Sequence, residues 1–285
     1  MRGGFILKQQ SVEEVKIPKI DVKSFKINKF LKNNYPALVI FLVVVGGWEL
    51  ICTLLNVATY ILPKPSDIFL AAQENWSNLV KSTSKTVFTS IIGFVISIVI
   101  GISVAVLLSL SRVIERAVYF YAIILQTIPV VAVAPIIVIW MGAGSSAIVA
   151  IVFLISFFPI LSNTLIGLNS TDKNLKNLFF LYNTSHLQTI MYLRIPAALP
   201  FILAGLKISA SLAVVGAIVG EYVAGIGGGS GGLGYSITIA ASRLQTPYLF
   251  ACGIAAAVLG ITFYLIINAI SNRLLKSWHE SATDH

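Results

Sequence analysis

Apolar residues in this chain gather into long blocks, which short polar segments separate. A helix needs about 20 largely apolar residues to cross the hydrocarbon core of a bilayer. Six blocks reach that length and predict transmembrane helices over residues 37–57, 87–108, 117–140, 147–168, 197–219 and 248–270. The pattern therefore predicts an all-α integral membrane protein with six transmembrane helices.

The amino-acid composition points to the same class. Hydrophobic residues make up 57% of the chain and charged residues only 11%, whereas a soluble domain carries about 25% charged residues. So few charges cannot cover a water-facing surface, which excludes a soluble globular protein. The two cysteines, Cys52 and Cys252, lie in apolar blocks and are interpreted as small buried hydrophobic residues. The histidines lack metal-ligand spacing.

The distribution of Lys and Arg predicts the orientation, because cytoplasmic segments carry an excess of these residues. With a cytoplasmic N-terminus, fifteen of the 20 Lys and Arg fall in inner segments, four fall in outer segments and Lys207 lies inside the fifth block. We expect a basic cytoplasmic N-terminal segment over residues 1–36, a six-span domain over 37–278 and a cytoplasmic tail over 279–285. The N-terminal segment is either an anchor for anionic lipid or a tail that binds a partner.

Two of the predicted spans carry a row of small residues at every fourth position. Close contact between small side chains holds helices together in lipid, so the rows predict tight packing, either within one subunit or across a dimer. The rows are Gly93, Ser97, Gly101, Ala105 and Ser109 in the second span, and Gly205, Ser209, Ala213 and Ala217, followed by Glu221, in the fifth.

The third predicted span contains two prolines deep in apolar sequence, Pro129 and Pro135. Proline in a spanning helix frees backbone carbonyls, which neighbouring groups or water must satisfy. Gln126 and Thr127 stand just before the first proline. Polar groups beside a broken helix either line a transport pathway or accompany a structural kink, and both interpretations stay open for Gln126 and Pro129.

The inner segment between the fourth and fifth spans, residues 172–196, is long for a connection in a compact bundle. Its first half carries apolar residues at three- and four-residue spacing, namely Leu175, Leu178, Phe179 and Tyr182. This spacing predicts a short helix with an apolar face. Such a helix can dock in a groove on a soluble partner or rest on the lipid surface.

A tight turn and a second helix are expected to follow. Asn183 tolerates the left-handed backbone that ends many helices, and Thr184 or Ser185 can cap the next helix. Pro196 and Pro200 are expected to close that helix before the fifth span begins. The segment is therefore predicted to form a helix-turn-helix on the cytoplasmic face.

This segment resembles the EAA loop of permease subunits from binding-protein-dependent ABC importers. The loop pattern is Glu-Ala-Ala, three residues, Gly, nine residues, Ile, one residue, then Leu-Pro. With Pro196 as its proline, the matching positions hold Ile195 for Leu, Leu193 for Ile, Asn183 for Gly and Asn177 for Glu. Asn177, Leu178 and Phe179 replace Glu-Ala-Ala, so a charged contact with the ATPase is expected to be missing.

Other stretches are similar to the nitrate, sulfonate and taurine branch of that family. They read "ILPKPSDIF", "IPVVAVAPIIVIWMGAG", "RIPAALPFILAGLKISA" and "GEYVAGIGGGSGGLGY". The resemblance covers about residues 37–278. It implies that the inner segment couples to the ATPase through Asn177, Leu178, Phe179, Asn183, Thr184, Ser185, Ile195 and Pro196.

The resemblance also implies the setting of the protein. Two permease copies, as a homodimer in the bacterial plasma (inner) membrane, would form the pathway. Two ATPase subunits would dock on the inner loops, and a soluble binding protein would deliver a small solute from outside. The chain itself would have no catalytic residue and no cofactor, since ATP and Mg would be bound by the ATPase. Nucleic acid is not an expected partner.

The run "GEYVAGIGGGSGGLG" contains the pattern G-x-G-x-x-G at Gly227, Gly229 and Gly232. A dinucleotide-binding fingerprint needs a preceding strand and a following helix, whereas this run follows a predicted span on the outer side. We interpret residues 221–247 as an outer glycine-rich loop. Residues 232–241 are apolar but too short to span, which suits a re-entrant or interfacial segment.

Glu221 is an ionisable residue at the end of the fifth span. Such a group either lines a water-filled pathway or pairs with another charge. Arg243, on the same outer side, is the candidate partner for a structural clasp. Both interpretations stay open, and the candidates for pathway or gate are Gln126, Pro129, Glu221 and Arg243.

Two other classes of function are weighed against an importer permease. A secondary transporter or channel that works alone often shows internal repeats and intramembrane charges, and it does not require the structured inner segment. An integral membrane enzyme would need paired carboxylates or a nucleophile with its base, and the spans carry no such arrangement. The expected solute is a small anion (nitrate, a sulfonate or taurine) or a small heterocyclic precursor.

Overall fold

The computed structural model describes residues 22–226 and 231–276, and every regular element in these two ranges is helical. The chain divides into two units, Met1–Leu54 and Leu55–His285. The described part of the first unit is a single helix, α1 (Val22–Leu54), which runs through Pro36. The polar residues before Pro36 and the apolar residues after it therefore belong to the same helix.

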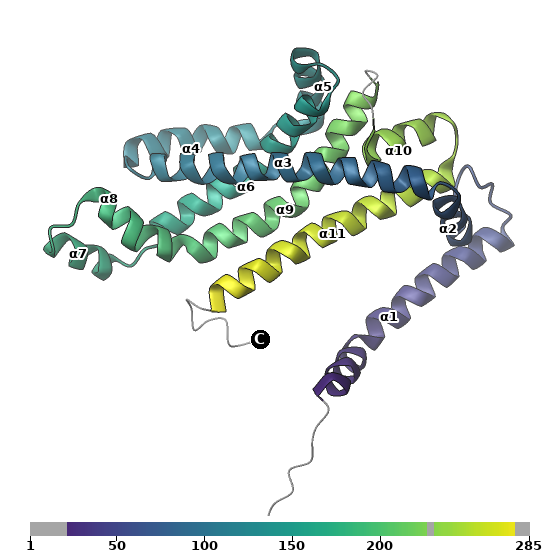
Figure 1. Ribbon diagram of the computed structural model, residues 1–285, viewed down its shortest axis with the longest axis horizontal. Helices are drawn as coiled ribbons and strands as arrows, with labels where there is room; N and C mark the ends of the chain where they lie inside the picture. The colour runs from purple at the N-terminus through teal and green to yellow at the C-terminus, as the bar shows by residue number, and fades with distance from the viewer. Residues whose placement is uncertain (1–21, 227–230, 277–285) are drawn as a thin grey trace, which may run out of the picture. The chain divides into compact units, whose positions relative to one another are not determined.

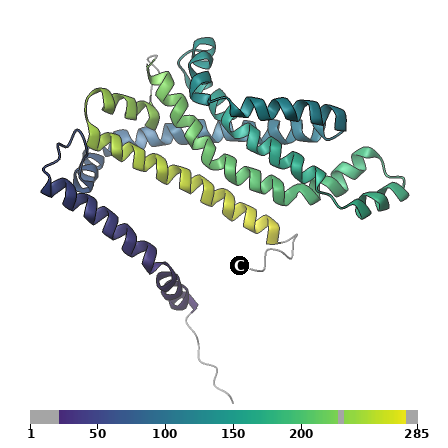
Figure 2. The same cartoon turned by 180° about the vertical axis from the view of Figure 1, so that it is seen from behind.

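The second unit is a bundle in which α6 packs between α3 and α9, and α11 packs against α9. Figures 1 and 2 show these helices side by side, with α7 and α8 beyond one end and α2 and α10 near the other. The elements are α2 (Pro65–Glu74), α3 (Trp76–Leu108), α4 (Arg112–Thr127), α5 (Val130–Met141), α6 (Ser145–Asn169), α7 (Lys173–Leu181), α8 (His186–Thr189), the π-helical turn η1 (Ile190–Arg194), α9 (Ile195–Ile226), α10 (Leu233–Ser242) and α11 (Thr246–Lys276).

The rows of small residues on α3 and α9 make close contacts with α6. A Cβ atom added to Gly93 would lie 2.4 Å from Cγ1 of Val152, and one added to Gly205 would lie 3.0 Å from the carbonyl oxygen of Pro159. Small side chains let helix backbones approach closely where lipid supplies no hydrophobic drive. The rows therefore pack within one subunit, a choice that the sequence pattern left open.

Hydroxyl groups reinforce this packing across the helices. The Ser209 hydroxyl donates to the carbonyl oxygen of Ser156 at 2.8 Å, and the Ser156 hydroxyl donates back to that of Ser209 at 3.4 Å. On the other side of α6, Ser97 of α3 donates to the carbonyl oxygen of Phe153 at 3.1 Å. Interhelical hydrogen bonds of this kind add to van der Waals packing in membrane bundles.

Within the described residues, four helical segments are long and apolar enough to span a membrane, namely Trp76–Leu108, Ser145–Asn169, His186–Ala224 and Thr246–Leu275. The pair α4 and α5 makes a fifth if the two count as one broken span. The apolar part of α1, Val39–Leu54, is shorter among the described residues, as is α10. The described part of this membrane protein is thus all-helical and has four or five spans by length and composition, where the sequence pattern predicted six.

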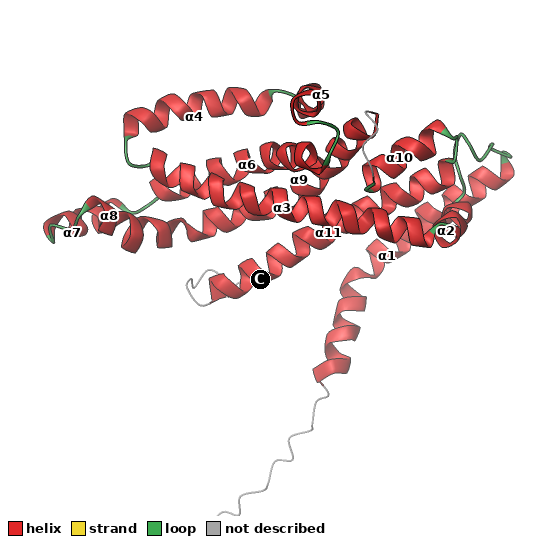
Figure 3. Ribbon diagram, turned by 45° about the horizontal axis from the view of Figure 1, so that its top comes forward, coloured by secondary structure: helices red, strands yellow, loops and turns green. Residues whose placement is uncertain are grey.

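The third predicted span is not one continuous helix. It breaks between Thr127 and Val130, and α4 and α5 meet at an angle of 94° (Figure 3). Ile128 has an extended backbone, which the following proline favours, and Pro129 is the N-cap of α5. Pro135 lies inside α5 without ending it.

The helix after the turn at Asn183 differs from the expectation in one respect. Pro196 and Pro200 do not close it, because α8 continues through η1 into α9. In η1 the N–H of Ile195 bonds to the carbonyl oxygen of Ile190, five residues earlier. A π-helical turn of this kind shifts the hydrogen-bond register. The helix α9 then begins at Ile195, so Pro196 lies in its first turn. A proline is tolerated there because the N–H that it lacks would have no intrahelical partner.

Candidate functional site

The segment over residues 172–196, called the coupling segment below, begins with the helix α7, and local hydrogen bonds hold both ends of this helix. Asp172 caps α7 by accepting from the N–H groups of Asn174 at 2.6 Å and Leu175 at 3.2 Å. Asn183 has a left-handed backbone with φ of +50°. The Thr184 hydroxyl then donates back to the carbonyl oxygen of Phe179 at 2.9 Å. The end of α7 is therefore closed by local hydrogen bonds.

Ser185 starts the second helix with a capping box. Its hydroxyl accepts from the N–H of Gln188 at 3.2 Å, and its own N–H donates to Oε1 of Gln188 at 2.7 Å. This reciprocal pair satisfies two donors that a helix start leaves without intrahelical partners. Of the two caps considered from the sequence, Ser185 takes that place, and Thr184 closes α7 instead.

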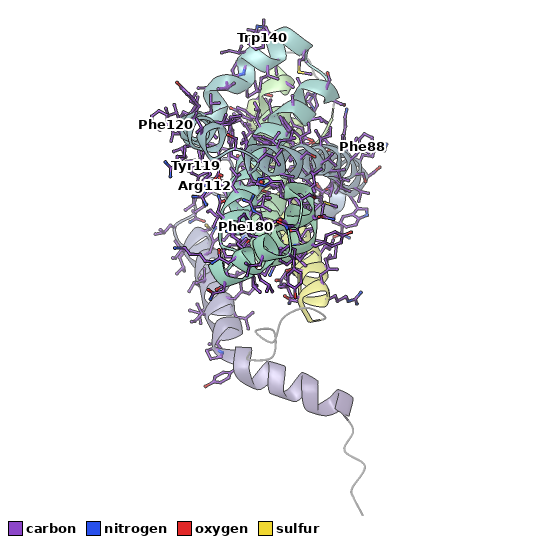
Figure 4. The ribbon with its side chains drawn as sticks, turned by 90° about the vertical axis from the view of Figure 1, so that its left-hand side faces the viewer. Phe88, Arg112, Tyr119, Phe120, Trp140 and Phe180 are labelled. Carbon is purple, nitrogen blue, oxygen red and sulfur yellow. The ribbon has the colours of Figure 1, made fainter. Side chains whose placement is uncertain are left out.

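The residues that the loop resemblance singled out lie in α7, in the turn that follows it and in the first turn of α9. Asn177, Leu178, Asn183 and Ser185 are exposed, whereas Phe179, Thr184, Ile195 and Pro196 are half-buried. Large apolar side chains reach solvent beside them, with Phe180 81% exposed and Leu187 69% exposed. Figure 4 looks onto this end of the molecule, where Phe180 and Arg112 are labelled. An exposed apolar surface of this kind suits contact with either a partner protein or the lipid surface.

Arg194 joins the coupling segment to two spanning helices. Its Nε donates to the carbonyl oxygen of Leu168 at 3.0 Å, and its Nη1 donates to that of Ser109 at 3.0 Å. Its Nη2 donates to Oδ1 of Asn169 at 3.1 Å. One guanidinium thus satisfies carbonyl groups at the ends of both α3 and α6, which a helix terminus leaves unpaired.

Sequence reasoning counted Arg194 only as a positive charge. The available signal was an arginine beside the start of a span, since basic side chains often hydrogen-bond the last carbonyls of a helix. The sequence did not indicate which helices would supply those carbonyls. Asn169, which holds the third bond, also donates through Nδ2 to Oε1 of Glu115 at the start of α4.

At the other end of the bundle, Glu221 is the centre of a buried hydrogen-bond cluster. Its side chain is 1% exposed. It accepts from the Thr86 hydroxyl at 2.9 Å, the Gly234 N–H at 3.0 Å and the Thr89 hydroxyl at 3.5 Å. The cluster joins α3, α9 and the first turn of α10.

Arg243 does not take part in this cluster. It is exposed and stands at the C-terminal end of α10. Between the two described side chains Glu221 and Arg243 the structure contains no ion pair, and the acceptor oxygens of Glu221 face Thr86, Thr89 and Gly234 instead. Glu221 and Arg243, which the sequence analysis considered as partners in a clasp, therefore do not bond to each other in the structure.

The glycine run ends in the structure at the Glu221 cluster. Gly227 and Gly229 lie outside the described residues, whereas Gly232 is the N-cap of α10 with φ of +100°. A Cβ atom there would lie 2.2 Å from the carboxyl carbon of Glu221. Gly232 thus combines a backbone that favours glycine with a close approach to the carboxylate. Residues 233–242 form the short apolar helix α10.

Gln126 and Pro129 lie at the broken span. Both are exposed, and Gln126 lines a cavity of about 410 Å³ with side chains of α4, α5, α6 and α9. The other walls include Leu125, Val133 and Pro159. The structure therefore places Gln126 and Pro129 together at the bend between α4 and α5, while Glu221 belongs to the buried cluster at α3, α9 and α10.

Comparison with known proteins identifies the family. A model of the "Binding-protein-dependent transport system inner membrane component" family matches residues 97–277. This chain belongs to that family. It is therefore a permease subunit of an ATP-driven importer, a non-catalytic multi-pass membrane protein that works with ATPase subunits and a soluble binding protein.

Two curated relatives match over most of their length. The chain is 35% identical to the formylaminopyrimidine transport permease protein ThiX of Halalkalibacterium halodurans, over 86% of this chain and 98% of that protein. It is 31% identical to the riboflavin transport system permease protein RibX of Chloroflexus aurantiacus, over 90% of this chain and 96% of that protein. These matches disfavour a carrier that works alone.

A solved structure shares the fold of this permease. The inward-facing MetNI methionine ABC transporter matches with a TM-score of 0.57 at 20% identity, over 72% of this chain and 98% of that chain. The match shows a common arrangement of helices.

Proposed function

We propose that this permease crosses the membrane six times, with both termini in the cytoplasm. The apolar part of α1, the broken pair α4 and α5, and the four long helices supply the six spans. The excess of Lys and Arg in the proposed inner segments supports this orientation. On this topology residues 1–36, the coupling segment and residues 279–285 are cytoplasmic, residues 37–278 form the permease domain, and residues 221–247 form an outer loop.

The coupling segment is proposed as the docking site for the ATPase. The single observation that carries this proposal is the capped helix-turn-helix of α7 and α8, which presents large apolar side chains to solvent. An amphipathic helix commonly lays such a face into a groove of its partner. The contact residues proposed are Asn177, Leu178, Phe179, Asn183, Thr184, Ser185, Ile195 and Pro196.

Movement of the docked segment would reach the spans through Arg194. This residue lies at the junction of η1 with α9, and its guanidinium bonds to the ends of α3 and α6. A rigid joint of this kind transmits a displacement to three helices at once. ATP and Mg, bound by the ATPase, would drive the displacement.

The broken span is proposed to line the pathway, with Gln126 and Pro129 at its bend. Irregular backbone at membrane depth is tolerated where protein buries it or where it borders a watery cavity. Glu221 is proposed as a structural centre that holds α10 against α3, since its acceptors are engaged by three donors. Arg243 stays a candidate contact at the outer mouth of the pathway.

We propose a homodimer with two ATPase subunits, to which the soluble binding protein delivers a small uncharged nitrogen heterocycle. The two relatives described above transport formylaminopyrimidine and riboflavin, according to their names. The cavity at the bend supports the same class, because its described lining is apolar apart from Gln126 and includes no Lys or Arg. The Gln126 amide can both donate to and accept from the edge of a heterocycle.

Affinity purification of the tagged full chain from its native membrane, followed by mass spectrometry, tests the docking proposal. The wild-type chain is expected to bring down an ATPase in equal amount. A variant with Leu178→Glu and Leu187→Glu is expected to lose it, because two charges enter the apolar docking face. Ile61→Glu is the matched control, since Ile61 is 64% exposed in the segment before α2.

Three outcomes bear on the proposal. Loss of the ATPase in the double variant alone supports docking at the coupling segment. Retention of the ATPase by the double variant places docking elsewhere. A dimeric wild-type chain without any ATPase would contradict the importer assembly itself.

A further inference from the structure

A cavity with a polar lining lies beside the coupling segment. It has a volume of about 360 Å³, and it is enclosed by α7 and α8, by Arg194 and by the ends of α3 and α6 with the start of α4. The charged side chains that line it are Arg112, Lys176, Arg194 and Glu115. Figure 4 shows the end of the molecule at which it lies.

Positive charge dominates this cavity, which is called the basic cavity below. Three cationic side chains face one carboxylate, and Oε1 of that carboxylate, on Glu115, already accepts from Asn169. The pKa of Lys176 is lowered, first by burial and then by repulsion from Arg194 and Arg112, and Asp172 offsets only part of this. The protein therefore holds like charges together with too little opposite charge to balance them.

One of the three cationic groups is positioned before any ligand arrives. Arg194 is fixed by its three hydrogen bonds to α3 and α6. Arg112 is the first residue of α4, and Ser111 at its N-cap forms no side-chain capping bond. The N–H groups and the positive end of the dipole at a helix start add to the attraction for an anion.

We propose that the basic cavity binds a phosphate-bearing anion, with Arg112 and Lys176 as its direct ligands and Arg194 as a fixed counter-charge. Arginine suits a phosphate because its planar fork can donate two parallel hydrogen bonds. A bound phosphate would bridge the start of α4 to α7 and remove the repulsion between them. The occupied cavity would thus brace the coupling segment against the spans.

Two sources can supply this chemistry. The first is the headgroup of an anionic phospholipid, since basic pockets between spanning helices bind such headgroups on the cytoplasmic side. Phe180 and Leu110, both exposed at the lining, would meet the glycerol and acyl part of a lipid. The second is free phosphate in the cytoplasm. Only the choice of membrane leaflet rests on the proposed orientation.

The test uses the full chain in nanodiscs made of phosphatidylcholine alone or with phosphatidylglycerol, with and without inorganic phosphate at constant ionic strength. The measurements are the thermal midpoint, the phospholipid retained in native mass spectrometry, and the ATPase recovered with each variant in the affinity purification described above. Anionic lipid is expected to raise Tm by roughly 3–6 °C and to be retained. Arg112→Gln and Lys176→Gln are expected to reduce retention at least about fivefold. Lys173→Gln, on the same helix but outside the lining, is the matched control.

Each outcome decides the proposal. A stabilisation by inorganic phosphate in phosphatidylcholine that the two variants abolish would support the site and identify a free anion as its ligand. No shift with either source, or equal effects in Lys173→Gln, would overturn it. If neither source binds, and Arg112→Gln and Lys176→Gln lose the ATPase while Lys173→Gln keeps it, the cavity receives an acidic side chain of the ATPase and the proposal is wrong. The docking proposal above would survive any of these results.

Discussion

Thr86 and Glu221 are 135 positions apart in the sequence, yet the Thr86 hydroxyl donates to the Glu221 carboxylate at 2.9 Å in a buried setting. The same hydroxyl oxygen accepts from the N–H of Leu233 at 2.8 Å. Thr86 therefore bonds to both α9 and the start of α10 while belonging to α3. The hydrogen bonds of Thr86 and Glu221 therefore join the three helices α3, α9 and α10.

Replacement of Thr86 by valine tests that joint with little change in shape. Thr86→Val leaves the Leu233 N–H without its acceptor and Glu221 without one donor, so the free energy of unfolding should fall by about 1–3 kcal/mol. Thr83→Val, one turn earlier, is the control, because the Thr83 hydroxyl bonds only within its own helix. Thermal unfolding of the two variants in detergent would give the comparison. Equal losses would mean that the interhelical bonds contribute nothing specific.

The role of the Glu221 charge can be separated from its role as an acceptor. Glu221→Gln keeps one acceptor oxygen and removes the charge, so we expect solute uptake per inserted molecule to stay within about threefold of wild type. Glu221→Ala leaves the Gly234 N–H without its acceptor and removes the bonds that join Thr86 and Thr89 to α9, so it should lower both stability and uptake. Uptake in vesicles together with Tm measures both. Loss of uptake in a stable Glu221→Gln variant would instead identify a charge-dependent gate.

Gly232 and Gly142 form a matched pair for a glycine test. Their backbones are similar, with φ of +100° and ψ of 163° at Gly232 and φ of +83° and ψ of 160° at Gly142. Alanine in this region is strained by about 1–3 kcal/mol at either site. Only Gly232→Ala adds a clash, because its Cβ would meet Glu221, whereas nothing lies within 4 Å at Gly142. Gly232→Ala should therefore lower Tm more, and similar shifts would contradict the packing of Gly232 on the carboxylate.

The contact between Gly93 and Val152 predicts a compensating pair of substitutions. Gly93→Ala should destabilise by about 1–3 kcal/mol, because the added methyl group overlaps the Val152 side chain. Val152→Ala makes room, so the double variant should be more stable than the sum of the two single effects. Gly260→Ala, with nothing within 4 Å of its Cβ position, should not destabilise the protein. Strictly additive effects in thermal unfolding would show that the two residues do not touch.

Arg194→Lys tests the proposed mechanical joint. Lysine keeps the charge but cannot reach Leu168, Ser109 and Asn169 at once, because it lacks the planar fork. We expect the ATPase to stay bound while solute transported per ATP falls roughly 5- to 150-fold, the usual range of coupling between sites. Parallel measurement of ATP hydrolysis and uptake gives the ratio. Arg273→Lys, at an exposed position near the end of α11, should leave it unchanged; an unchanged ratio in Arg194→Lys would remove this residue from the coupling path.

Much of the helical content could be predicted from the sequence, because it depends on local pattern. Four of the expected spans correspond to long apolar helices. The left-handed Asn183 and the capping Ser185 also follow from the backbone preferences and short side chains of these residue types. The sequence likewise marked Pro129 as a place where a helix can break, because proline lacks an N–H and restricts the residue before it.

The tertiary structure decided everything that depends on partners from distant parts of the chain. The 94° bend at Pro129 is set by packing around the break, and proline alone does not specify an angle. Pro196 was expected to end a helix, but the π-helical turn η1 leads directly into α9, and Pro196 lies in the first turn of that helix. The hydrogen-bond partners of Glu221 and Arg194 are residues 13 to 135 positions away. Local propensity acts over a few residues, whereas these bonds form only when α3, α6 and α9 are brought together, so the sequence determined the helices and the packing determined the sites.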